Sequence, residues 1–231
     1  MAAAEEDEEA RDKDDPAGEN ALADDIGRLA SAETNVRRAA LRQLRPLVRA
    51  GDTAADLLHA GLIEALVSLL SGTQANSEER VQAAQMLADL CQSPDGSRRA
   101  AAAGGCQLLV RGLRGPHPVE ACKALAGIAG DKDGRDAIEA AGGGMALVDI
   151  VGRAASPHSV QLEATCALRN LALGADNRIR IVASGGHDVL VGLVEMNGER
   201  PVELRTAAAA TLANLALYRY IPSRCRHPTR A

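Results

Sequence analysis

A glycine that follows a small residue and precedes a Leu-Val pair recurs four times along this 231-residue chain. The copies run from Ala60-Gly61 to Leu66-Val67, Ala103-Gly104 to Leu109-Val110, Ala141-Gly142 to Leu147-Val148, and Ser184-Gly185 to Leu190-Val191. Successive glycines are 43, 38 and 43 residues apart. Ankyrin and tetratricopeptide units are about 33 to 34 residues long, so a longer period is typical of other helical solenoids. The repeat therefore predicts an all-α array.

Each copy also carries a second shared element, a helix with one apolar stripe. Ala164, Leu168 and Leu171 show it, because residues at i, i+4 and i+7 lie on one face of a helix. Stretches that stop helices, such as Ser93-Pro94-Asp95-Gly96 and Gly115-Pro116-His117-Pro118, fall between the elements. Pro and Gly thus lie where a helical array needs turns.

The composition limits both the core and the function. The chain has no Trp or Phe, and its two aromatic residues are Tyr218 and Tyr220, so Ala, Leu, Val and Ile must build the core. This argues against nucleic-acid modules that stack bases on aromatic rings. No run of 18 apolar residues is present, so we expect no membrane insertion.

Charge is distributed unevenly along the chain. Residues 1–20 hold nine acidic residues against Arg11 and Lys13, whereas residues 218–231 hold four arginines and no acid. We expect residues 1–20 to be a solvated, disordered leader and residues 218–231 to be a basic tail. The body between them is nearly neutral, which gives no electrostatic case for binding DNA or RNA.

The cysteine count indicates a reducing compartment. The chain has five cysteines, an odd number, and four of them lie within apolar helical runs. This pattern is typical of small buried thiols rather than of a disulfide framework. We therefore expect the protein in the cytosol, and also in the nucleus.

Catalytic and metal chemistry find little support. Gly142-Gly143-Gly144 matches neither phosphate-binding glycine motif and is best explained by a turn with positive φ. Ser184, His187 and Asp188 have the residue types of a hydrolase triad, but triad partners converge from distant segments. No His pair at i, i+4 and no C-x-x-C occurs. We expect no enzyme activity, no catalytic residue, no metal and no cofactor.

One junction makes the repeat specific. Residues 167–186, which read ALRNLALGADNRIRIVASGG, resemble the junction between armadillo repeats, and the similarity extends over about 190 of the 231 residues. The resemblance implies a right-handed α-solenoid, each repeat having a short first helix, a glycine turn and two longer antiparallel helices. It places four repeats in 52–217 (52–93, 95–130, 131–174 and 175–217), and an incomplete leading repeat in 22–50.

In armadillo proteins the third helices line a concave groove, which the resemblance carries over to this chain. Residues four and seven positions before Asn170 share its helical face, and the same rule applies in each repeat. The predicted groove comprises Gln82, Gln85, Asp89, Glu120, Lys123, Gly127, Glu163, Cys166, Asn170, Ala207, Ala210 and Asn214, with Arg169 beside it. Asn170 and Asn214 are the strongest candidates, because an amide can donate to and accept from a partner's main chain. The alternative is that each bonds the neighbouring repeat.

Two local features would make the predicted groove uneven: a cluster of four arginines and one glycine within a third helix. Arg37, Arg38, Arg42 and Arg45 indicate a basic N-terminal end or, alternatively, a solvated face. Gly127 stands where later repeats have asparagine, and its low helix propensity predicts a loosened point in the array.

The predicted function is a non-enzymatic scaffold that binds an extended segment of a partner protein. The alternative is a recruiting adaptor of a ubiquitin-ligase or chaperone complex. The last third helix has Ala209, Leu212, Leu215 and Ala216 on an apolar face that a following repeat would cover. We expect self-association through this face, rather than a cover formed by Tyr218, Tyr220 and Ile221.

Overall fold

The structure is a computed structural model that describes residues 16–51, 54–195 and 200–217. Within these ranges there are fourteen α-helices, one short 3-10 turn and no strand. The helices are α1 (Pro16–Gly27), α2 (Thr34–Ala50), α3 (Ala54–His59), α4 (Leu62–Ser71), α5 (Ser77–Leu90), α6 (Pro94–Ala102), α7 (Gly105–Gly112), α8 (Pro118–Ile128), α9 (Lys132–Ala140), α10 (Gly143–Gly152), α11 (His158–Leu171), α12 (Ala175–Ala183), α13 (Gly186–Glu195) and α14 (Val202–Ala216).

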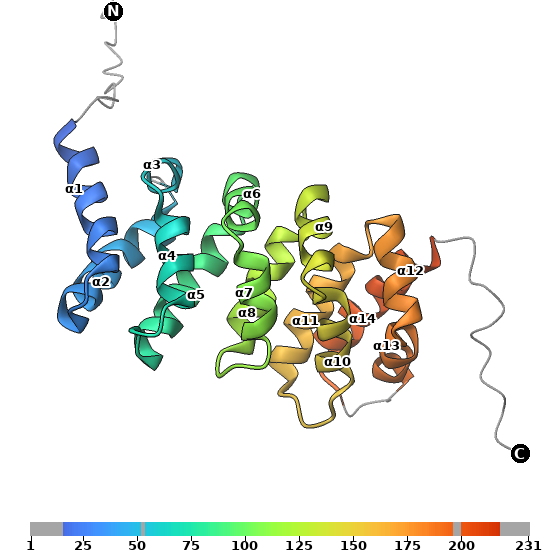
Figure 1. Ribbon diagram of the computed structural model, residues 1–231. Helices are drawn as coiled ribbons and strands as arrows, with labels where there is room; N and C mark the ends of the chain where they lie inside the picture. Colours follow the sequence, from blue (N-terminus) through green and yellow to red (C-terminus); the bar gives the residue numbers. More distant parts are fainter. Residues whose placement is uncertain (1–15, 52–53, 196–199, 218–231) are drawn as a thin grey trace, which may run out of the picture.

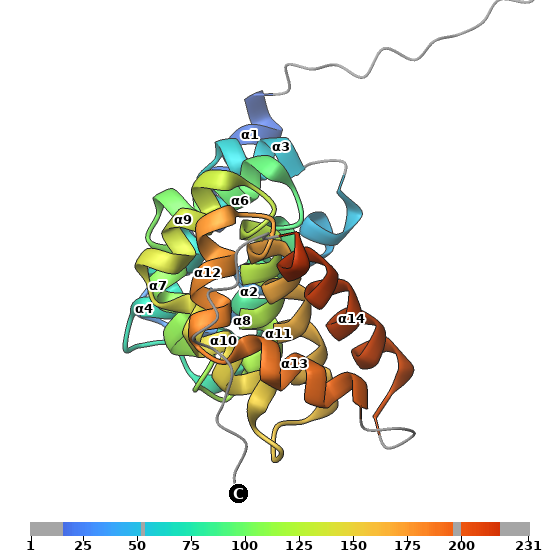
Figure 2. The ribbon, with the colours of Figure 1, turned by 90° about the vertical axis from the view of Figure 1, so that its right-hand side faces the viewer.

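From α3 onward the helices follow in groups of three, and helices at the same place in each group stack side by side (Figure 1). The first helices are α3, α6, α9 and α12, the second are α4, α7, α10 and α13, and the third are α5, α8, α11 and α14. Seen along the array, the first and third helices lie on different sides (Figure 2). Each third helix contacts the next, and α2 contacts α5 at the N-terminal end. The predicted all-α solenoid is confirmed.

The N-terminal end differs in detail from the expectation. Helix α1 begins at Pro16, so the last five residues of the segment expected as a leader, 16–20, belong to a helix. A 3-10 turn, Arg28–Ala30, joins α1 to α2.

Residues 1–15 and 218–231, which include Tyr218, Tyr220 and Ile221, lie outside the described residues. None of the described helices is both long and apolar enough to cross a membrane.

Glycines form the sharp turns between first and second helices. The four repeat glycines, Gly61, Gly104, Gly142 and Gly185, have φ between 74° and 83°, a region that favours glycine. In the last three repeats a second glycine follows because the chain packs too closely there for a side chain. A Cβ on Gly143, for example, would lie 2.4 Å from Cγ2 of Ile138. The predicted positive-φ turn is confirmed.

The core is built from leucine and alanine, as the composition requires. Leu87, Leu125 and Leu168 occupy equivalent places in successive third helices and are fully buried. Burying each leucine contributes about 1.5 to 3 kcal/mol. Ala124 and Ala167 are also fully buried, and their small size lets neighbouring helices approach closely.

Gly127 is a point of close contact, not of loosening. Helix α8 has 11 residues, whereas α5 and α11 have 14, so the Gly115-Pro116-His117-Pro118 link does shorten this repeat. A Cβ on Gly127 would nevertheless lie 2.1 Å from the carbonyl oxygen of Cys91. The predicted loosening is wrong, because the missing side chain allows α8 to pack directly on the end of α5.

The outer side of α14 is less apolar than expected. Leu215 is buried in the core, Leu212 is partly buried, and Ala209 and Ala216 are exposed. Leu215 therefore does not belong to an exposed face, since it packs with the core of the last repeat.

Candidate functional site

The outward-facing residues of the third helices form one continuous surface, which we call the third-helix face. It has three rows, because residues at i, i+3 and i+7 share one side of a helix. Helix α2 extends each row at the N-terminal end. The upper row is Arg42, Gln82, Glu120, Glu163 and Ala207; the middle row is Arg45, Gln85, Lys123, Cys166 and Ala210; the lower row is Arg49, Asp89, Gly127, Asn170 and Asn214.

The structure brings nearly all of the predicted groove residues to this surface. Asp89 and Lys123 are exposed. The others that are partly exposed are Gln82, Gln85, Glu120, Gly127, Glu163, Cys166, Arg169, Asn170, Ala210 and Asn214. Ala207 is the exception. It is buried with 6% exposure, on a part of α14 that packs against its neighbouring helices, so its prediction as a groove residue is wrong.

The two asparagines bond the preceding third helix. Asn170 Nδ2 donates to the carbonyl oxygen of Ala126 at 2.8 Å, and Asn214 Nδ2 donates to that of Arg169 at 3.1 Å. These carbonyls need a side-chain donor because the helix tightens in its last turn. The N–H of Gly130, for instance, donates to the carbonyl oxygen of Gly127, so the carbonyl oxygen of Ala126 receives no main-chain donor from it. The structure thus agrees with the alternative interpretation, in which each asparagine bonds the neighbouring repeat.

At the junction where Gly127 takes the place of the asparagine, the preceding repeat supplies the donor from its own residues. No asparagine is present to reach the carbonyl oxygen of Ala88, and Gln92 Nε2 donates to it instead, at 3.1 Å. The pattern analysis missed Gln92. Its position four residues after Ala88, just beyond the end of α5, is the signal that would have found it.

Charged residues on the third-helix face bond residues of the neighbouring helix. Lys123 Nζ lies 3.9 Å from Glu163 Oε1, and Arg45 Nη2 donates to Gln85 Oε1 at 3.1 Å. Arg42 and Arg49 are exposed, and neither makes a hydrogen bond or an ion pair with the described residues. The basic character of the face is therefore concentrated on α2.

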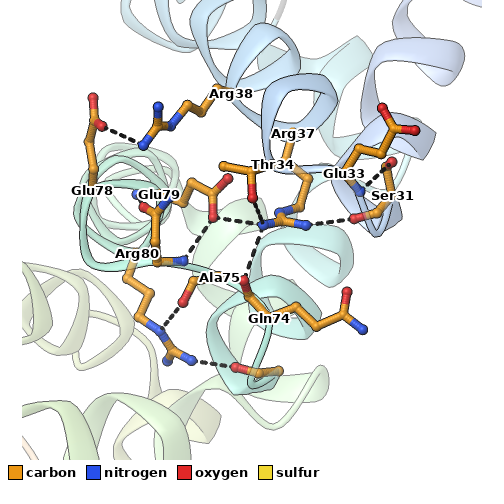
Figure 3. A network of polar contacts seen from close by, with 12 residues as sticks. Ser31, Glu33, Thr34, Arg37, Arg38, Gln74, Ala75, Glu78, Glu79 and Arg80 are labelled. Atoms are coloured by element: carbon orange, nitrogen blue, oxygen red, sulfur yellow. Dashed lines mark hydrogen bonds and ion pairs between the residues drawn. The ribbon is translucent and has the colours of Figure 1, made fainter.

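Arg37 does not belong to the basic end or to a solvated face. Its side chain is 2% exposed, and Nη2 lies 3.1 Å from Oε2 of the fully buried Glu79 (Figure 3). Neighbouring oxygens accept further bonds from its two terminal nitrogens: Nη1 donates to the carbonyl oxygens of Ser31 and Ala32, and Nη2 donates to Thr34 Oγ1 and to the carbonyl oxygen of Gln74. The prediction is corrected, since Arg37 lies one position away from the exposed stripe and points into the junction between α2 and α5.

Glu79 serves two parts of this junction at once. Its Oε2 accepts from the main-chain N–H of Asn76 at 2.8 Å, and the Asn76 side chain accepts from the N–H of Glu79 at 2.9 Å. This reciprocal capping box begins α5. The ion pair and the cap together fix the orientation of α2 against the first complete repeat.

Other reactive side chains show no assembled chemistry. Ser184 Oγ donates to the carbonyl of Ile181 at 2.9 Å, and no group of three or more metal-binding side chains exists in the described part of the chain. The four described cysteines are free. On the third-helix face, burial raises the pKa of the Cys166 thiol, and Arg169 partly opposes that effect.

Comparison with known proteins gives matches among solved structures. No protein-family model matches the sequence, and no curated protein matches it. An engineered protein of known crystal structure is 30% identical to this chain. The match covers 86% of this chain and 80% of the engineered protein, with a TM-score of 0.78. A designed armadillo repeat protein is 24% identical over 85% of this chain and 82% of its own, with a TM-score of 0.77.

A second designed armadillo repeat protein was solved in complex with the peptide (KR)4. It is 24% identical to this chain. The match covers 84% of this chain and 81% of the designed protein, with a TM-score of 0.76. These likenesses agree with the repeat motif, the positive-φ glycine turns and the three stacks of helices. The chain therefore has an armadillo-like repeat fold.

Proposed function

We propose that this chain is a non-enzymatic scaffold that binds an extended segment of a partner protein along the third-helix face. The observation that carries the proposal is the continuity of this face. Five successive helices, α2, α5, α8, α11 and α14, present side chains at the same three positions, and most of these are polar and at least partly exposed. A regular surface of this kind matches the regular main chain of an extended segment.

The asparagines suit this role because they are already held in place. The Nδ2 of Asn170 is held by Ala126 and that of Asn214 by Arg169, while neither carboxamide oxygen accepts a hydrogen bond from a described residue. A fixed acceptor loses little side-chain entropy when a partner's N–H bonds it. Bonding the neighbouring repeat and binding a partner are thus compatible.

Two further facts bear on the proposal. The designed armadillo protein with a bound (KR)4 peptide shares the fold, which supports a peptide-binding use of the fold but does not identify a ligand for this chain. The alternative of an adaptor in a ubiquitin-ligase or chaperone complex gains no support from the described residues or from the comparisons.

A display library of random extended peptides tests the proposal. We expect selected peptides to bind the full chain, and to bind a Gln82→Ala/Lys123→Ala variant several-fold more weakly. The matched control is Gln107→Ala/Lys132→Ala, in which the same residue types are removed from exposed positions on α7 and α9. The proposal fails if no peptide is enriched, or if both variants lose affinity equally.

A further inference from the structure

Four arginines follow one side of α2 at positions 38, 42, 45 and 49. This spacing places them in a single line, which we call the arginine row. The row faces α5, because Arg38 Nη2 lies 3.2 Å from Glu78 Oε2 and Arg45 bonds Gln85. The arginine row therefore forms the N-terminal end of the third-helix face.

The row alternates between engaged and unengaged cations. Arg38 and Arg45 are held by α5, whereas Arg42 and Arg49 are exposed and have no bonding partner within the described residues. Asp89 is the acidic residue nearest in register to Arg49, yet the two form no ion pair. Two guanidinium groups, with their planar forks of donors, thus remain available to an external anion.

We propose that the arginine row is a subsite for an aspartate- or glutamate-rich stretch of the partner segment. The inference rests on the proposed function, because it assigns a chemistry to one end of the bound segment. A segment that follows the middle row crosses α2 at Arg45. Arg42 and Arg49 then lie on its two sides, about 10 Å apart along the helix.

The alternation of an extended chain fits this arrangement. Successive side chains of an extended segment point to opposite sides, so two neighbouring carboxylates meet Arg42 on one side and Arg49 on the other. Arginine pairs with carboxylate through two parallel hydrogen bonds, which adds geometric selectivity to charge attraction. Because the cations are spread along a line and do not converge on one point, the row favours several single charges over one multiply charged group.

The rest of the face argues against a nucleic acid as the occupant. Beyond α2 the same surface carries Asp89, Glu120 and Glu163, and only Lys123 opposes them in the rows. A nucleic acid strand carries a charge about every 3.4 Å and would meet these acids along the face. A protein segment can place acidic residues over α2 and uncharged residues elsewhere.

Fluorescence anisotropy with labelled peptides tests the assignment. We expect hexaglutamate to bind the full chain more tightly than hexaglutamine, and to lose affinity as salt is raised. An Arg42→Gln/Arg49→Gln variant should bind hexaglutamate about fivefold to tenfold more weakly. The control, Arg111→Gln/Arg114→Gln, removes the same charge from exposed residues of α7 and the turn after it, and should bind like the unchanged chain.

Several outcomes would overturn the assignment. Equal binding of hexaglutamate and hexaglutamine, or equal losses in the two variants, would remove the subsite. A single-stranded RNA that displaced hexaglutamate at lower concentration would make nucleic acid the better occupant. If hexaglutamate bound only after Glu5, Glu6, Glu8 and Glu9 were changed to Gln, the chain's own leader would be the occupant instead. Library peptides that still bound the third-helix face would leave the proposed function standing while the acidic subsite failed.

Discussion

Asn170 Nδ2 donates to the carbonyl oxygen of Ala126, 44 residues earlier in the chain, at 2.8 Å. The bond joins α11 to α8 at a carbonyl that the last turn of α8 leaves without a main-chain donor. Asn214 repeats the arrangement between α14 and α11. The residue type proposed to bind a partner is therefore also part of the junction between repeats.

Replacing Asn170 with Ala should destabilise the fold. The carbonyl of Ala126 would lose the one side-chain donor that the described residues give it, at a partly buried position, which costs about 1 to 3 kcal/mol. Urea unfolding followed by circular dichroism measures the loss. Asn35→Ala is the control, because Asn35 is exposed on α2 and makes no side-chain hydrogen bond, so its change should stay within about 0.5 kcal/mol. Equal losses in the two variants would contradict a structural role for the asparagine.

Local signals in the sequence are sufficient to place the three helices of the last repeat. In the last repeat the resemblance to armadillo junctions implies helices over 176–184, 187–196 and 201–217, and α12, α13 and α14 differ from these bounds by one residue at each end. Gly185 and Pro201 explain this agreement. The first needs positive φ, and the second lacks an N–H and precedes the first turn of α14, so both mark boundaries that tertiary contacts cannot move.

Contacts between distant residues were beyond the reach of the pattern. Arg37 and Glu79 are 42 residues apart, and the arginine cluster alone indicated a basic or solvated surface. The helical period indicates which side of a helix is apolar. A shift of one residue along the helix, however, decides whether an arginine lies on the exposed stripe or in the junction. For the same reason Gly127 appeared weak in isolation, although the approach of Cys91 requires it.

Removing Arg37 should be among the most damaging single changes. Arg37→Leu leaves the carboxylate of Glu79 buried without its cation, which typically costs about 3 to 5 kcal/mol. Adding Glu79→Gln should restore part of the loss, because glutamine keeps the capping bond but carries no charge. Chemical denaturation of the single and double variants measures both effects.

The neighbouring ion pair provides the control for this prediction. Arg38 and Glu78 lie 3.2 Å apart, but their side chains are 38% and 55% exposed. Water screens such a pair, so Arg38→Leu should cost no more than about 1 kcal/mol. A similar cost for Arg37→Leu and Arg38→Leu would show that burial of the first pair has no energetic consequence.

Two glycines on helices should respond to alanine in opposite directions. Gly127→Ala forces a Cβ to within 2.1 Å of the Cys91 carbonyl, so α8 must move away from α5 and stability falls. Gly192 lies inside α13 with no atom within 4 Å of an added Cβ, so Gly192→Ala should stabilise by about 0.5 to 1 kcal/mol. Thermal melting of both variants gives the signs directly, and a higher melting temperature for Gly127→Ala would disprove the close contact.

The described cysteines should differ in their reaction with alkylating agents. Burial, with a smaller contribution from Cys106, raises the pKa of the Cys91 thiol to about 12, and burial beside Glu163 and Glu120 raises that of Cys122 to about 12. Cys166 is only partly buried. We expect iodoacetamide at pH 8 to label Cys166 well before Cys91 or Cys122, since the thiolate is the nucleophile. Peptide mapping by mass spectrometry measures the order, which should disappear in denaturant.

The thiols of Cys91 and Cys122 should make the free energy of unfolding depend on pH above neutrality. In the unfolded chain they ionise near pH 9, whereas in the folded chain they stay protonated to about pH 12. The unfolded state therefore binds fewer protons between these values, and stability that is complete below pH 9 is lost as pH rises, by about 1.4 kcal/mol per pH unit for each thiol. A Cys91→Ala/Cys122→Ala variant has a lower starting stability but should show a shallower decline in urea midpoint between pH 9 and 10.5. Parallel declines in the two proteins would mean that other groups cause the alkaline loss.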